Sequence, residues 1–177
     1  NVSKQCERLQ ILTDSLLQLI RLEQKRQLDR IETVNLVLIL NQEVLALHPL
    51  AENRNLTIST STPDELSVSG DPFLLALAIR NLLHNAMQFA TSGSTITATL
   101  RHAEGVITLG ITNQGTAIPE FALHRLGERF YSLPHPDGSK GTGLGLAFVR
   151  EIMALHHGAF RIGNVDNGVE ASLVIPG

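Results

Sequence analysis

The chain is poor in the residues that several common kinds of site require. It has no Trp, one Tyr and 4% aromatic residues in all, so its core must be largely aliphatic. A single cysteine, Cys6, permits no internal disulfide and suggests either a reducing compartment or no redox role. Fourteen basic residues against 17 acidic ones give a net charge of −3, so no basic field points to nucleic acid.

Long apolar runs are also absent. The longest, Phe73–Ile79, is far too short to span a membrane. The 177 residues, 43% of them hydrophobic, are enough for one domain with a real core and some extra chain. The sequence begins at Asn1 without Met and without a signal-peptide pattern, so we expect a piece of a longer protein.

Leucines spaced by three and four predict a first helix over residues 3–30, with a stripe of Leu9, Leu12, Leu16 and Leu19. Such a helix can pack on its own domain or form half of a dimerising helical hairpin. We favour the hairpin, because the helix precedes the domain. The polar run 24–27 is typical of a solvated exit.

The remaining chain alternates helical and strand patterns. Asn35 and Asp71 are expected to cap helices, with Pro72 at a first helical position, Pro49 as a stop and Gly158 as a C-terminal cap. Helices are predicted over 35–47, 71–90 and 145–156, and a short helix or loop over 119–128. Strands are predicted over 56–60, 67–69, 94–102, 106–113, 159–164 and 168–175.

A glycine-rich turn directly precedes the last helix. Gly141, Gly143 and Gly145 alternate with Thr142 and Leu144, and Leu146 follows. Glycine lets the backbone approach a ligand closely, and the helix start offers unpaired N–H groups. This arrangement suits phosphate, although a lone glycine-rich turn is weak evidence.

Two amides lie one turn apart on the helix that Asp71 caps. Asn81 and Asn85 project from one face, which Gln88 shares. Surface asparagines are the plainer interpretation. The functional alternative is that Asn85 offers its carbonyl oxygen to Mg²⁺, which takes few protein ligands and keeps water and phosphate oxygens.

Three further segments follow. Residues 113–119 place Asn113 at a strand end and Gly115 where a flat ligand can approach closely, or form an ordinary turn. Residues 128–131 contain an aromatic pair that also suits the edge of a core. Residues 132–140 are rich in Pro, Gly, Ser and Asp and are expected to form a mobile lid.

In this order the segments resemble the catalytic ATP-binding domain of bacterial sensor histidine kinases, within the superfamily of gyrase, heat-shock chaperones and MutL. Residues 81–89 resemble the N box, 113–118 the G1 box, 128–131 the F box and 141–146 the G2 box. The run 129–134 is similar to that of CreC-type kinases.

The resemblance implies an α/β two-layer sandwich, with a mixed β-sheet covered on one face by three helices and a long dimerisation-type helix before it. Residues 1–32 would be the C-terminal part of the dimerisation hairpin and 33–177 the catalytic domain. It also implies ATP and Mg²⁺ as cofactors, with Asn85 as metal ligand and Asn81 facing the phosphates. Other nucleotide contacts would come from Gln88, Phe89, Asn113, Gly115, Ala117, Ile118, Tyr131, Lys140, Gly141, Thr142, Gly143, Leu144, Gly145 and Leu146.

Four positions depart from the family pattern. Asn113 replaces the usual Asp, Ala117 the second G1 glycine, Gln88 a common basic residue and Gly127 the first Phe of the F box. Each bears more on catalytic competence than on the fold.

The phosphoacceptor motif, a His followed by an acidic residue, is absent. None of the seven histidines precedes Asp or Glu: His48, His84, His102, His124, His135, His156 and His157. We therefore expect the acceptor helix upstream of Asn1.

The expected function is transfer of the γ-phosphoryl group of ATP to that histidine, for relay to a response-regulator aspartate. The alternative is a non-catalytic nucleotide-sensing or docking module that controls response-regulator phosphatase activity; a related ATPase without histidine transfer is a third possibility. Partners would be the acceptor helix, a response regulator and a second copy, with no nucleic acid. The resemblance implies a cytoplasmic domain of an inner-membrane sensor.

Overall fold

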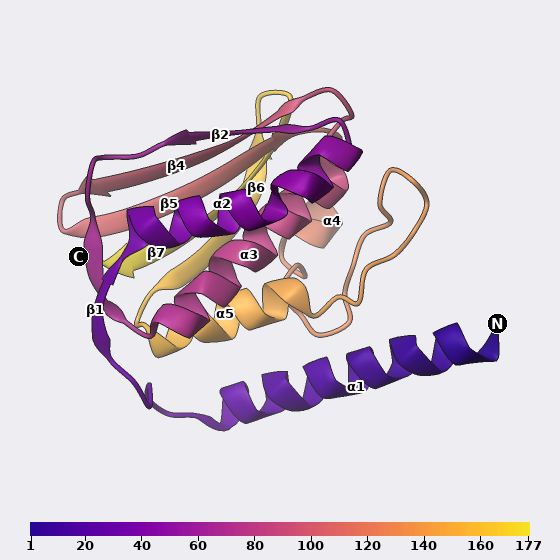
Figure 1. Cartoon of the computed structure of the whole chain (residues 1–177), viewed down its shortest axis with the longest axis horizontal. Helices are drawn as coiled ribbons and strands as arrows, with labels where there is room; N and C mark the ends of the chain where they lie inside the picture. The colour runs from indigo at the N-terminus through magenta and orange to yellow at the C-terminus, as the bar shows by residue number, and fades with distance from the viewer.

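The computed structural model describes all residues, 1–177, and its centre is a five-stranded mixed sheet (Figure 1). The strand order is β2-β4-β5-β7-β6, in which only the β2–β4 pair is parallel. The strands are β2 (Thr57–Ser61), β4 (Thr95–Ala103), β5 (Val106–Gln114), β6 (Ala159–Val165) and β7 (Gly168–Pro176). A separate antiparallel pair joins β1 (Glu32–Asn35) to β3 (Ser67–Gly70).

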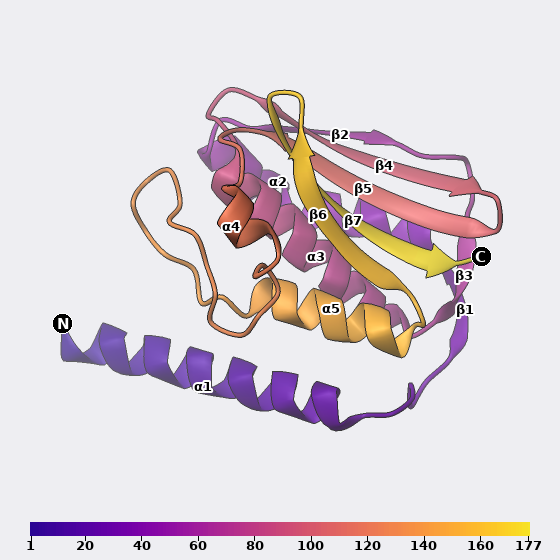
Figure 2. The same cartoon turned by 180° about the vertical axis from the view of Figure 1, so that it is seen from behind.

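Three helices cover one face of this sheet, as Figures 1 and 2 both show: α2 (Leu36–Asn53), α3 (Pro72–Phe89) and α5 (Gly145–Leu155). The short α4 (Glu120–Leu123) lies beside β6. Side chains alternate along β5: Ile107, Leu109 and Ile111 are each at most 3% exposed, whereas Thr108 and Thr112, which point to the other face, are only partly buried. The expected two-layer α/β sandwich is confirmed.

The helix starts follow the capping chemistry that the sequence predicts. Asn35 accepts hydrogen bonds from the N–H groups of Val37 and Leu38, at 3.0 and 3.2 Å. Asp71 does the same for Phe73 and Leu74, with Pro72 in the first turn. These side chains satisfy amides that have no partner within the helix.

One predicted helix end is wrong, and the cap of another helix differs in detail from the expectation. Pro49 does not stop α2, which continues to Asn53. Four residues earlier, Leu45 is 74% exposed, so water can reach the backbone carbonyl whose partner the proline removes. At the end of α5 the left-handed residue is His157, with φ of 56°, and not Gly158. Gly158 instead donates to the Met153 carbonyl at 2.8 Å, in a Schellman-type cap.

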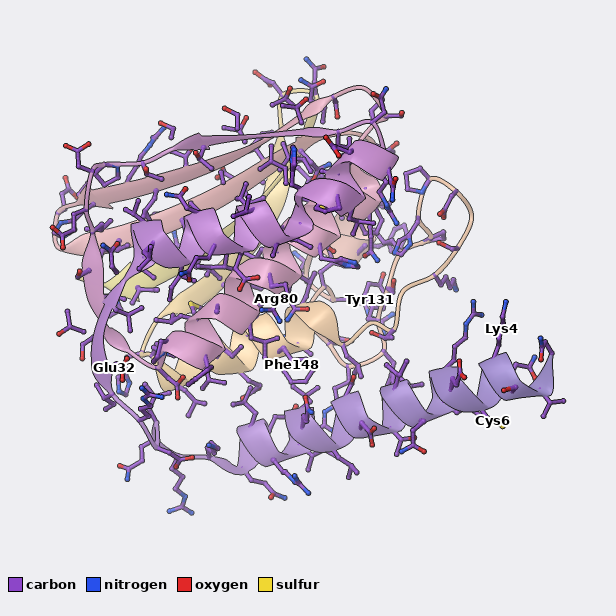
Figure 3. The ribbon with its side chains drawn as sticks, viewed as in Figure 1. Lys4, Cys6, Glu32, Arg80, Tyr131 and Phe148 are labelled. Atoms are coloured by element: carbon purple, nitrogen blue, oxygen red, sulfur yellow. The ribbon has the colours of Figure 1, made fainter.

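The first helix is shorter than predicted: α1 spans Val2–Gln24 and not residues 3–30. Leu19 and Leu22 are buried against the rest of the domain, and Phe148 extends from α5 toward α1 (Figure 3). Leu9, assigned to the apolar stripe, is 62% exposed. Only the C-terminal half of α1 therefore packs on the domain, and the free half projects away (Figures 1 and 2). No helix combines the length and apolarity needed to cross a membrane.

A partly buried ion pair joins α2 to α3. Glu43, only 7% exposed, accepts from Arg80 through both carboxylate oxygens at 2.8 and 3.0 Å. This hydrogen-bonded contact raises the pKa of Arg80 above its ordinary value. The paired fork geometry satisfies a carboxylate that would otherwise be costly to bury.

Candidate functional site

A cavity of about 230 Å³ opens between the C-terminal half of α3, the end of β5 and the segment after it. Eight of its 13 lining residues are hydrophobic. The lining residues are Asn85, Phe89, Asn113, Thr116, Ala117, Ile118, Pro119, Leu126, Leu133, Pro134, Leu146, Ile162 and Val169. An apolar slot with a few polar groups suits a flat heteroaromatic ligand.

Asn113 is the buried polar group of this slot. It stands opposite Val169 of β7 in the sheet register and is 4% exposed. Its Nδ2 donates to the Gln114 carbonyl at 3.3 Å. This bond orients the amide so that Oδ1 stays available as an acceptor. The site therefore presents one acceptor against an apolar wall, where it can receive a ligand N–H.

The two amides of α3 have different surroundings. Asn85 lines the cavity. Asn81, one turn earlier, donates to the Leu77 carbonyl of its own helix at 3.0 Å. A Cβ atom on Gly145 would lie 3.1 Å from Asn81 Oδ1, so Asn81 reaches the first turn of α5. The structure thus brings the amide helix and the glycine-rich turn together.

The glycine-rich turn depends on Gly143, whose φ is +74°. Its carbonyl accepts from the Phe130 N–H at 3.0 Å, and a Cβ atom here would lie 2.5 Å from the Phe130 carbonyl carbon. Thr142 Oγ1 accepts from the Leu144 N–H at 3.3 Å. No side chain caps the start of α5, so its first N–H groups remain available to an anion.

The β6–β7 hairpin holds the segment after β5 through hydrogen bonds to its backbone. Asn164 binds the backbone of Ile118 twice, accepting from its N–H at 2.7 Å and donating to its carbonyl at 2.9 Å. The Gly115 N–H donates to the Asn167 carbonyl, and a Cβ on Gly115 would lie 2.6 Å from the Phe89 carbonyl oxygen. Close approach of two backbones, rather than an unusual φ, therefore requires glycine at position 115.

His135 anchors the segment that we expected to be a lid. It is 8% exposed and meets Phe89 edge-to-face, with ring centroids 5.0 Å apart. Its Nδ1 lies 3.0 Å from Ser139 Oγ, and Asp137 accepts from both the N–H and the hydroxyl of Ser139. These bonds to Ser139 hold the pKa of the Asp137 carboxyl below its usual range. Residues 135–139 thus form a hydrogen-bonded turn with one side chain inserted into the domain.

His84 adds a second titratable group near this anchor. Burial lowers its pKa, and the charges of Arg54 and His135 lower it further. A protonated imidazole is therefore disfavoured beside Asn85, so the helix presents a neutral surface here at pH 7.

The structure brings together part of the predicted site. Six of the residues line the cavity: Asn85, Phe89, Asn113, Ala117, Ile118 and Leu146. Asn81, Gly115 and the turn 141–145 lie close to it through the contacts described above. The other three neither line the cavity nor make any of these contacts: Gln88, the exposed Lys140, and Tyr131, whose ring instead has the Arg125 guanidinium 4.2 Å from its centroid.

Sequence reasoning missed seven lining residues: Thr116, Pro119, Leu126, Leu133, Pro134, Ile162 and Val169. Thr116 and Pro119 belong to the segment 113–119, which the sequence had already singled out, so they could have been predicted. Ile162 and Val169 arrive from a distant hairpin, and no local signal distinguishes them from ordinary core residues. The clamp by Asn164 is likewise a purely tertiary contact.

The residues present fit a phosphate-bound divalent cation rather than a metal held by the protein alone. No group of three or more His, Cys, Asp or Glu side chains is arranged to hold a metal ion. One amide oxygen on Asn85, which lines the same cavity as Leu146 of the uncapped first turn of α5, matches the sparse protein coordination that Mg²⁺ accepts.

Comparisons with known proteins agree with this geometry. Residues 70–176 match the family described as histidine kinase-, DNA gyrase B-, and HSP90-like ATPase. The chain is 36% identical to the sensor protein CreC of Escherichia coli strain K12 over 174 residues, which is 98% of this chain and 36% of that protein. It thus spans about a third of the length of that relative.

Solved structures show the same fold. Full-length ShkA in complex with AMPPNP superposes with a TM-score of 0.84 at 23% identity, covering 98% of this chain and 36% of that one. Histidine kinase ThkA in complex with the response regulator TrrA gives 0.80 at 21% identity, over 99% and 49% of the two chains.

Proposed function

Because this chain belongs to the family of histidine kinase-, DNA gyrase B- and HSP90-like ATPases, as a histidine kinase catalytic domain, we propose that it binds Mg-ATP and donates the γ-phosphoryl group to a histidine. The acceptor is on a dimerisation helix, from which the group passes to a response-regulator aspartate. The observation that carries the proposal is one continuous site: an apolar slot with a buried acceptor, followed by an amide helix and an uncapped helix start.

The base end of the site supports adenine. Asn113 is held at the end of β5 with its oxygen available, because its NH₂ group is bonded to Gln114. An adenine amino group can donate to that oxygen while the ring packs on Ile118 and Leu146. The clamp by Asn164 on Ile118 fixes this wall before any ligand arrives, which reduces the cost of ordering it.

The phosphate end is built from backbone and amide groups. The first N–H groups of α5 and the turn at Gly143 offer donors to phosphate oxygens. Asn85 would hold Mg²⁺, which would supply charge neutralisation of the phosphates, and Asn81 would orient the phosphates from the preceding turn of α3. Catalysis by such a site is positional and electrostatic.

The remaining parts of the proposal concern the whole protein. In it, α1 is the C-terminal part of the dimerisation hairpin, so residues 1–32 form one unit and 33–177 the catalytic domain. The exposed apolar side chains of α1, such as Leu9 and Ile11, suit pairing with another helix in a homodimer. ShkA was solved with AMPPNP and ThkA with a response regulator, which supports nucleotide and regulator as ligands here. The domain would lie in the cytoplasm, as part of a membrane sensor.

Calorimetric titration of ATP with and without Mg²⁺ tests the proposal. We expect Mg²⁺ to strengthen binding to the wild-type chain, and Asn85→Ala to abolish that gain together with phosphotransfer to a supplied acceptor helix. Asn41→Ala makes the same change at an exposed site on α2 and should behave as the wild type.

Two results would count against it. Equal Mg-ATP affinity and transfer in the Asn85 and Asn41 variants would remove Asn85 as metal ligand. Nucleotide binding by the wild type with no transfer to any acceptor helix would favour the docking-module alternative.

A further inference from the structure

A second hollow lies on the outer side of β6, separate from the nucleotide cavity. Its volume is about 450 Å³, and it is lined by Leu123, His124, Leu126, Arg150, Phe160, Arg161 and Ile162. We call these seven residues the β6 groove. Figure 2 shows β6 at the edge of the sheet with α4 and α5 beside it. Only Leu126 and Ile162 line both this hollow and the nucleotide cavity.

The groove combines an apolar floor with cationic side chains. Four lining residues are hydrophobic, and the others are Arg150, Arg161 and His124, with no acidic residue among them. Neither arginine belongs to any of the ion pairs of the structure, whereas nearby Arg125 is paired with Glu128 at 3.3 Å. The groove thus carries unneutralised positive charge on a chain whose net charge is −3.

The position of Arg150 depends on Gly127. A Cβ atom at position 127 would lie 2.2 Å from Arg150 Cδ, and the φ of Gly127 is +99°. The arginine stem therefore occupies the space that a Cβ at position 127 would take, and the positive φ of Gly127 separately favours glycine there. Its apolar stem packs against the backbone of Gly127, and the side chain lines the groove together with the apolar residues.

The third feature of the groove is the free backbone edge of β6. β6 pairs only with β7, so its other edge has no strand partner. The Asn164 side chain covers this edge near its end through Ile118, but residues 160–162 face the groove. An unpaired strand edge is a template for an added strand.

We propose that the β6 groove binds an extended acidic peptide of a partner protein, which adds to β6 as a strand. Its backbone would pair with residues 160–162, and an apolar side chain would enter between Leu126 and Phe160. Its carboxylates would meet Arg150 and Arg161. Charge complementarity selects acidic over neutral or basic peptides, and the free edge selects an extended peptide over a helix.

The test uses the 177-residue chain and a labelled peptide, acetyl-Glu-Leu-Asp-Phe-Glu-Leu-Asp-amide, in a fluorescence anisotropy titration at about 50 mM salt, where screening is weak. The control peptide replaces Glu and Asp by Gln and Asn. We expect the acidic peptide to bind at least tenfold more tightly. Arg150→Glu and Arg161→Glu should each weaken its binding about tenfold, and Arg101→Glu, an exposed arginine on β4, less than twofold.

Backbone amide NMR shifts locate the complex. The proposal expects them at 123–126 and 160–162, and shifts confined elsewhere overturn it. Equal affinity for the two peptides, or equal effects of the Arg161 and Arg101 reversals, also overturns it. Arg161 is exposed on an edge strand, so its reversal stays informative if Arg150→Glu fails to fold.

Binding to phosphatidylserine vesicles that is lost with the same reversals, with no peptide binding, would assign the groove to a membrane surface and refute the peptide proposal. Nucleotide titrations are measured separately, so failure of either proposal leaves the other intact.

Discussion

Replacing Asn113 by Asp tests how the site distinguishes adenine from guanine. Asn113 presents Oδ1 as acceptor while its Nδ2 donates to the Gln114 carbonyl at 3.3 Å. ATP can use this oxygen as it stands. GTP presents a carbonyl at the same point, so the amide must turn over and lose that bond, which costs roughly 0.5–1.5 kcal/mol. The wild type should therefore prefer ATP to GTP only modestly.

The aspartate changes both sides of the comparison. A hydrogen bond from the adenine amino group to a charged acceptor contributes roughly 1.5–3 kcal/mol, against about 0.5–1.5 kcal/mol for a neutral one. The guanine carbonyl would face a carboxylate and be repelled. Burying a charge at a position that is 4% exposed offsets part of the gain. We expect the ATP/GTP affinity ratio to widen about tenfold, equivalent to ~1.4 kcal/mol.

The assay is calorimetric titration of both nucleotides, with Mg²⁺, into the wild type and Asn113→Asp. Asn41→Asp makes the same chemical change on the exposed face of α2 and should leave the ratio unaltered. If the ratio in Asn113→Asp is unchanged or narrower, Asn113 does not read the base, and the assignment of residues 113–118 to the base end is wrong.

Three further outcomes are expected. The chain should bind Mg-ATP but stay unlabelled by γ-labelled ATP, since no histidine precedes an acidic residue; acid-labile label on it would contradict this. Asn164→Ala removes two hydrogen bonds to Ile118 and should lower the free energy of unfolding by about 1–3 kcal/mol; an unchanged urea midpoint would refute the clamp. His156 donates to the Ile152 carbonyl and accepts from the Asp71 N–H, and burial lowers its pKa below the ordinary 6.5. The contribution of His156 to the free energy of unfolding is therefore complete above pH 6.5 and declines as the pH falls below that value. The urea midpoint should change less between pH 7.5 and 5.5 in His156→Gln than in the wild type.

The local chemistry of the chain determined most of its elements. Asn35 and Asp71 cap helices because a short side-chain oxygen before an apolar helix has two orphan N–H groups within reach. The strands at β4 and β5 follow from alternation, because one face must be buried and the other solvated. The prediction at Pro49 was wrong because the proline removes only the hydrogen bond to the carbonyl of Leu45, an exposed residue, and tertiary packing holds α2 on its domain.

The candidate site was predictable where its residues are consecutive. Asn81 and Asn85 share a face because helical periodicity places residues four apart together, and the turn at 141–145 carries its glycines in sequence. The order of these segments was enough to indicate the family, which the match over residues 70–176 confirms.

Only the tertiary structure decided what meets across the fold. Asn164 holds Ile118 from 46 residues away, and His135 packs on Phe89 although its own segment is polar. The backbone carbonyl of Phe89 requires glycine at position 115, and the stem of Arg150 lies against Gly127. Such contacts depend on strand order and helix placement. These are determined by how the buried faces of all helices and strands pack at the same time. A single sequence carries the local pattern of each face but not which faces pack against each other.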